Sequence, residues 1–111
     1  GYSEKFVTDN VVTSGGKVYH IIIESNSTIT NFGFNQGDLL ITFDITGPRG
    51  TIGYAKVRVP TALMVSPFIV YVDSNRIYPI YSGDLTYTNI YFTYNLSTHR
   101  VVIQGQAPIP P

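Results

Sequence analysis

The segment Leu39–Thr46 most constrains the fold of this chain, because its side chains alternate in character. One set is apolar and the other is mostly polar; the first comprises Leu39, Ile41, Phe43 and Ile45, the second Leu40, Thr42, Asp44 and Thr46. Successive side chains of a β-strand point to opposite faces, so this alternation indicates a strand with one buried face. Such a strand needs a second apolar layer to cover it, and we therefore expect two packed layers.

Turn-forming residues divide the rest of the chain into segments of similar length. The strands that we expect lie at 6–12, 17–25, 28–34, 39–46, 51–59, 68–72, 76–80, 85–94 and 99–104, and 61–65 is a candidate single helical turn. Turn signals every 8 to 12 residues are typical of an all-β sandwich. The sequence predicts an antiparallel, immunoglobulin-like β-sandwich of about eight or nine strands over 17–105, followed by a proline-rich tail at 106–111.

Residues 1–16 form an N-terminal arm or edge strand with two interpretations. Phe6, Val7, Val11 and Val12 are apolar enough to pair in a sheet, and Gly15-Gly16 provides a joint after them. The arm is then either the first strand of its own domain or a strand donated to a neighbouring subunit, because sheet edges are open templates for such pairing.

The composition argues against several functions. A chain of 111 residues with no net charge and 13% charged residues lacks the basic face that nucleic acid requires. It contains no cysteine, which removes disulfide scaffolds, thiol chemistry and the usual zinc and iron–sulfur ligand sets. Because no run approaches the roughly 20 apolar residues that span a bilayer, we expect no transmembrane segment.

Two N-x-S/T acceptor sequences lie at expected strand ends. They are Asn26-Ser27-Thr28 and Asn95-Leu96-Ser97. A glycan at a strand end can extend into water, which makes both asparagines candidate glycosylation sites. The alternative is that Asn, Ser and Thr are simply good turn residues. Asn95 is the better placed of the two, because we expect it at the tip of a hairpin.

Three strings of this chain resemble a domain found near the C-terminus of many predicted archaeal cell-surface proteins. The strings are IIIESNSTITNFGF, ITFDITGPRGTIGYAKVRVPTALM and YTNIYFTYNLSTHRVVIQG. That family typically has a strand ending in SNST, a TGPxGTxGF motif and an IYFTYxxSTH-like strand pair. The resemblance runs from about residue 16 to 105. Ala55 departs from it, because the family often has cysteine there.

The resemblance implies an extracellular β-sandwich and no enzymatic activity. We therefore expect a non-catalytic module of an archaeal surface protein, acting as a spacer, stalk or adhesion domain. Its expected partners are other surface-protein domains, copies of itself or glycans. One alternative is a subunit of an extracellular filament assembled by strand exchange, and another is a carbohydrate-binding module.

Aromatic side chains are the basis of the carbohydrate alternative. Tyr54, Tyr87 and Tyr91 are candidate sugar or protein contacts, with Tyr87 and Tyr91 expected on one face of their strand. Flat aromatic rings stack on sugars. Cross-strand aromatic pairing explains the same residues without a ligand.

Catalytic and metal-binding patterns are weak in this chain. Ser97, His99 and Asp84 supply the residue types of a hydrolytic triad, but no nucleophile elbow or glycine-rich oxyanion turn accompanies them. The turn aspartates Asp38, Asp44, Asp73 and Asp84 are oxygen donors for Ca²⁺, but they are dispersed along the chain. We expect surface polar residues in both cases, with no enzyme, cofactor or metal.

Overall fold

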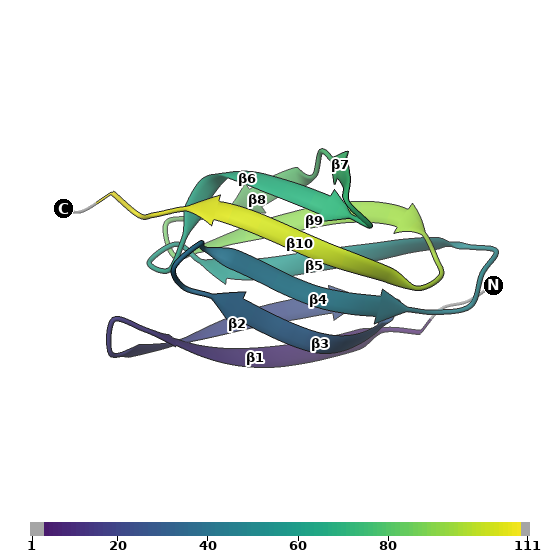
Figure 1. Cartoon of the computed structure of the whole chain (residues 1–111), viewed down its shortest axis with the longest axis horizontal. Coiled ribbons are helices and arrows are strands. Elements are labelled where there is room, and N and C mark those ends of the chain that lie inside the picture. Colours follow the sequence, from purple (N-terminus) through teal and green to yellow (C-terminus); the bar gives the residue numbers. More distant parts are fainter. Residues whose placement is uncertain (1–3, 110–111) are drawn as a thin grey trace.

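The computed structural model describes residues 4–109, which form ten β-strands in two five-stranded sheets (Figure 1). The strands are β1 (Phe6–Ser14), β2 (Lys17–Ser25), β3 (Thr28–Asn35), β4 (Leu40–Thr46), β5 (Ile52–Pro60), β6 (Val65–Val72), β7 (Asn75–Ile77), β8 (Ile80–Gly83), β9 (Tyr87–Asn95) and β10 (His99–Gln106). The first sheet has the order β1-β2-β5-β9-β8 and the second β3-β4-β10-β6-β7. Every hydrogen-bonded pair is antiparallel.

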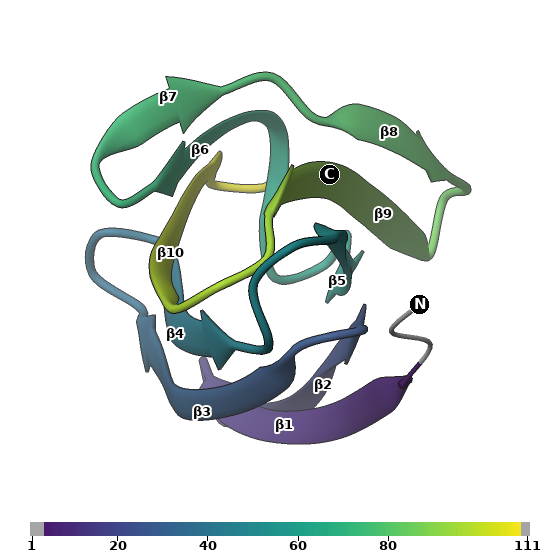
Figure 2. The same ribbon diagram turned by 90° about the vertical axis from the view of Figure 1, so that its right-hand side faces the viewer.

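The two sheets pack face to face, as the end view in Figure 2 shows, and their buried apolar side chains form one core cluster. Within β4, the alternation predicted from the sequence is confirmed, since Ile41, Phe43 and Ile45 are fully buried. Leu39 is only partly buried and lies just before the strand with a φ of 54°. Full burial of an isoleucine or phenylalanine side chain, as at these three positions of β4, stabilises the fold by about 1.5–3 kcal/mol. The predicted β-sandwich is therefore the observed architecture.

The strand count differs from the prediction because of Pro79. We expected one strand over 76–80, whereas the chain leaves β7 of the second sheet at Ile77 and enters β8 of the first sheet at Ile80. Proline has no N–H to donate to a ladder, and Pro79 lies in the gap between Ile77 and Ile80, where the ladder of β7 ends. The interruption lets the chain change sheets, and residues 4–109 hold ten strands rather than eight or nine.

The N-terminal arm is an edge strand of its own domain in this structure. β1 pairs with β2 over nine residue pairs, from Phe6 opposite Ser25 to Ser14 opposite Lys17. The joint between the two strands is a tight two-residue turn, in which Gly15 and Gly16 have φ values of 59° and 77°. A hairpin turn with two left-handed residues favours glycine at both positions. The two glycines therefore fold the arm back onto β2.

The described chain begins and ends at opposite ends of an elongated molecule. Its principal extents are 47 × 24 × 23 Å. The N-terminal pole holds Phe6 at the start of β1, the β2–β3 corner and the β9–β10 turn, whereas β10 ends at the other, C-terminal pole (Figure 1). Residues 4–109 contain no apolar helix of bilayer-spanning length.

A buried hydroxyl cluster at the N-terminal pole fixes the corner where the chain passes from β2 to β3. The Tyr94 hydroxyl contacts Ser27 Oγ at 2.6 Å and Ser25 Oγ at 3.1 Å, and it donates to the Tyr54 carbonyl at 2.9 Å. Burial raises the pKa of this tyrosine. Its ring lies against Gly53, where an added Cβ would stand only 2.1 Å from a ring carbon. Glycine is therefore required beneath the ring.

Candidate functional site

Asn26 lies at the N-terminal pole with its side chain inside the fold. Only 7% of the residue is exposed. Its Nδ2 donates to the Ile52 carbonyl at 3.0 Å, and its Oδ1 accepts from the Tyr54 amide at 3.0 Å. The carboxamide thus hydrogen-bonds to the β5 backbone in the way that the backbone of a neighbouring strand would. The folded structure therefore gives a glycan on this nitrogen little access to solvent.

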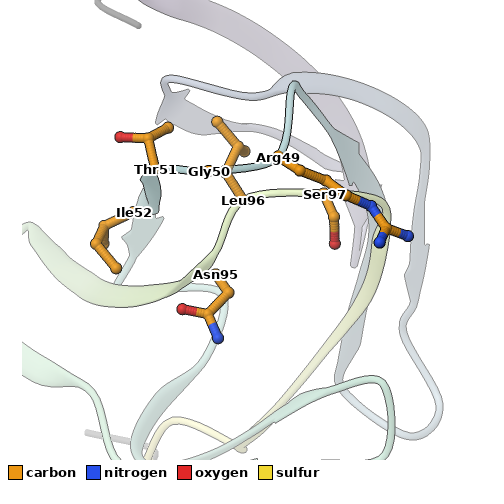
Figure 3. A pocket seen from close by; sticks show the side chains of 7 residues that line it. All are labelled: Arg49, Gly50, Thr51, Ile52, Asn95, Leu96 and Ser97. Atoms are coloured by element: carbon orange, nitrogen blue, oxygen red, sulfur yellow. The ribbon is translucent and has the colours of Figure 1, made fainter. Parts of the chain in front are cut away.

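Asn95 lies at the same pole but is exposed, at the last position of β9. Figure 3 shows its carboxamide directed away from the neighbouring Leu96 side chain, which is buried. The Leu96 amide donates to the Thr51 carbonyl at 3.0 Å, and the Gly47 amide donates to the Ser97 carbonyl at 3.1 Å. These bonds join the β9–β10 turn to the β4–β5 loop. The acceptor amide is therefore presented to solvent from an anchored turn.

An open groove of about 650 Å³ runs beside Asn95, between the same two loops (Figure 3). It is lined by Arg49, Gly50, Thr51, Ile52, Asn95, Leu96 and Ser97. Ile52 is 60% exposed, so the lining combines an apolar side chain with the cationic Arg49. The groove leaves room beside the acceptor for the first sugars of a glycan or for a docking segment.

His99 ties the acceptor turn to the β6–β7 hairpin. Its Nδ1 lies 2.5 Å from Asp73 Oδ2, and its Nε2 lies 2.5 Å from the Asn95 carbonyl and 3.0 Å from Ser97 Oγ. Partial burial acts to lower the pKa of His99, but the bonds to Asp73 and Asn95 outweigh it and raise that pKa. The His99 bond in turn holds the pKa of Asp73 below its ordinary value, with help from the Arg100 amide.

The group of Ser97, His99 and Asp73 has the connectivity of a triad, but the Asn95 carbonyl lies closer to His99 Nε2 than Ser97 Oγ does. The acid beside the imidazole is Asp73 and not Asp84, whose carboxylate accepts the amides of the β8–β9 turn. The Asn95 carbonyl can only accept, so Nε2 carries a proton in this contact and donates it to that carbonyl, which leaves this nitrogen no lone pair for the Ser97 proton. A general base requires such a lone pair. The arrangement therefore holds the turn in place.

The three candidate tyrosines lie on the outer face of the first sheet, where each ring already has a protein neighbour. The rings of Tyr54 and Tyr91 stack with centroids 6.0 Å apart, and the Arg58 guanidinium lies 4.2 Å above the Tyr87 ring. The Tyr54 hydroxyl also donates to Glu24 at 3.0 Å. The cross-strand aromatic pairing that offered an alternative to a sugar platform is present for Tyr54 and Tyr91, whereas Arg58 lies over the Tyr87 ring.

The four candidate aspartates do not converge. Within residues 4–109 no three potential metal-ligating side chains gather at one place. Asp44 instead contacts Arg100 at 2.9 Å and Asn31 at 2.7 Å. Each oxygen of the Asp44 carboxylate therefore already accepts a hydrogen bond, one from the Arg100 guanidinium and one from the Asn31 amide.

Sequence reasoning missed two parts of this site. One is Asp73 as the partner of His99, and the other is the inward carboxamide of Asn26. The position of Asp73 in an Asp-Ser-Asn hairpin turn was visible, but not which strand would lie beside that turn. Comparison with protein-family models, curated proteins and solved structures finds no match to this chain.

Proposed function

We propose that this domain is a non-catalytic extracellular module of an archaeal surface protein, serving as a spacer or stalk. The resemblance of its three strings to archaeal surface domains supplies the cellular context. The observation that carries the spacer role is the placement of the start of β1 and the end of β10 at opposite poles of a 47 Å body. A domain with this geometry adds its full length to a chain of domains joined end to end.

The exposed acceptor at Asn95 supports an extracellular location. The groove beside it is open and leaves space around the acceptor. The native protein should therefore be heavier than its sequence mass, and Asn95→Gln should remove part of the excess. Intact-mass measurement on material from the source organism tests this, with Asn26→Gln as the second variant. An unmodified native mass would refute the glycan proposal.

Imaging the full-length native protein on its cells tests the spacer role directly. Gold-labelled antibody against this domain, combined with electron cryotomography, should place the label at the cell surface at a fixed distance from the membrane. A label inside the cell would refute the proposal. A label repeating along free filaments would favour the alternative of a filament subunit.

The intramolecular pairing of β1 favours the spacer over strand exchange. Nine residue pairs and a two-glycine turn occupy the arm within its own domain. Light scattering separates the two alternatives. We expect the chain to remain monomeric and the deletion of residues 1–14 to lower its stability, whereas concentration-dependent association that is lost on deletion would support the filament. A glycan array tests the carbohydrate-binding alternative.

A further inference from the structure

We propose that the domain is built to bear tension along its long axis, with both of its terminal strands loaded in shear. The biological use of this property rests on the proposed spacer function, but the property itself belongs to the fold. Antiparallel ladder bonds run perpendicular to their strands. Force along a strand therefore loads all bonds of a ladder together, whereas force across the strands breaks them one after another.

The direction of β1 places the first ladder in shear. β1 starts at the N-terminal pole at Phe6 and runs toward the C-terminal pole, where Ser14 meets Lys17. A pull on the chain before Phe6, directed away from the molecule, acts along β1. All nine pairs with β2 must then slide at once. β2 is held in turn by β5 through the pairs from Ile22 to Ser25.

The direction of β10 places the second ladder in shear as well. β10 starts at the N-terminal pole at His99 and ends at Gln106, at the C-terminal pole (Figure 1). A pull on the tail after Gln106 acts along β10. This strand is central in its sheet, between β4 and β6, so that two ladders resist its withdrawal. The Gly105 amide adds a bond to the Leu39 carbonyl at 3.0 Å.

Side-chain links reinforce the first of these ladders. Lys5 and Glu24 form an ion pair at 3.5 Å, Asp9 contacts His20 at 2.8 Å, and Asn10 Nδ2 donates to the Ile21 carbonyl at 3.1 Å. Each link joins β1, or the residue before it, to β2.

Comparable links hold β10 to its neighbours. Arg100 contacts Asp44 of β4 at 2.9 Å, and the backbone amide of Arg100 donates to Asp73 at 2.8 Å. His99 bonds to the same aspartate. The two strands that receive the load are thus tied to their neighbours by side chains as well as by backbone.

Single-molecule force spectroscopy with two pulling directions tests the proposal. The chain has no cysteine, so paired cysteine substitutions give unique attachment points. Glu4→Cys with Ile109→Cys applies force along the axis. Glu4→Cys with Thr28→Cys applies force at one pole, across β1 and β2, and serves as the matched control because all three positions are exposed. Urea unfolding establishes that the two double variants are equally stable.

We expect a severalfold higher unfolding force for the axial pair than for the polar pair at the same loading rate, because forced unfolding follows the barrier along the pulled direction and not the equilibrium stability. Equal forces, or a lower axial force, would overturn the proposal. The result is independent of cellular location. An intracellular label in the imaging experiment would refute the spacer function and leave the mechanical finding intact. Equal unfolding forces with a label at the cell surface would overturn the mechanical proposal and leave the spacer function intact.

Discussion

Replacement of Tyr94 by phenylalanine should destabilise the domain far more than the same change at Tyr54. Removal of the Tyr94 hydroxyl leaves Ser27 Oγ without the contact of 2.6 Å that it makes in the described structure, and Ser27 is fully buried. The Tyr54 carbonyl retains its bond from Ser25 Oγ at 2.6 Å. The orphaned serine hydroxyl sets the cost, which is about 1–3 kcal/mol for a buried polar group that loses its partner.

Tyr54→Phe is the matched control, because it removes the same atom from a half-exposed position. The Tyr54 hydroxyl donates to Glu24, and both groups reach water when that bond is lost. We expect a loss below about 1 kcal/mol for this variant. Urea unfolding of both variants gives the comparison, with the midpoint reporting stability and the slope reporting whether the transition remains two-state.

A double-mutant cycle with Ser27→Ala identifies the cause. If the orphaned hydroxyl carries the cost, Ser27→Ala should cost less in the Tyr94→Phe background than in the wild type, with a coupling of about 0.5–3 kcal/mol. Strictly additive losses would refute this account of the cluster. So would a Tyr94→Phe variant as stable as Tyr54→Phe.

Three further predictions test the core, the arm and the contact between His99 and Asp73. Phe43→Ala should lower the free energy of unfolding by about 3–5 kcal/mol, and a near-neutral result in urea unfolding would contradict its complete burial. Gly15→Ala should cost about 1–2 kcal/mol because of its left-handed φ, whereas Gly37→Ala should be nearly neutral, and equal losses would argue against the turn assignment. The His99–Asp73 clasp should stabilise most between about pH 3.8 and 6.5, because the raised pKa of His99 makes its contribution disappear at higher pH and the lowered pKa of Asp73 makes its contribution disappear at lower pH. Thermal unfolding of Asp73→Asn and wild type across pH checks this, and a difference that grew above pH 8 would contradict it.

Local patterns predicted the sheets but not the path between them. The alternation in Leu39–Thr46 and the bounds of Lys17–Ser25 were readable because a strand with one buried face leaves a period of two in the sequence. The division of the expected strand 76–80 into β7 and β8 was not predicted, since the same residue types suit one strand or two. Pro60 and Pro67 lie within strands of this chain whereas Pro79 lies between two, so a proline alone does not predict where the chain changes sheets.

The candidate site was predictable only in its positions along the chain. The acceptor sequences at Asn26 and Asn95 look alike, yet one carboxamide is buried and the other is exposed. The difference arises from long-range contacts, since Asn26 bonds to Ile52 and Tyr54 of β5, which are 26 and 28 positions further along the chain. A short motif carries no information about such partners.

The close approach of Gly53 to Tyr94 sets an expectation for how this domain can diverge during evolution. The two residues face each other across β5 and β9, and the ring occupies the space that any side chain at position 53 would need. A lineage that acquires a larger residue at 53 must also give up the aromatic ring at 94, and with it the hydroxyl that serves Ser25 and Ser27. Positions 53 and 94 should therefore vary as a correlated pair among homologous sequences, with the two serines becoming free to change only after the ring is lost.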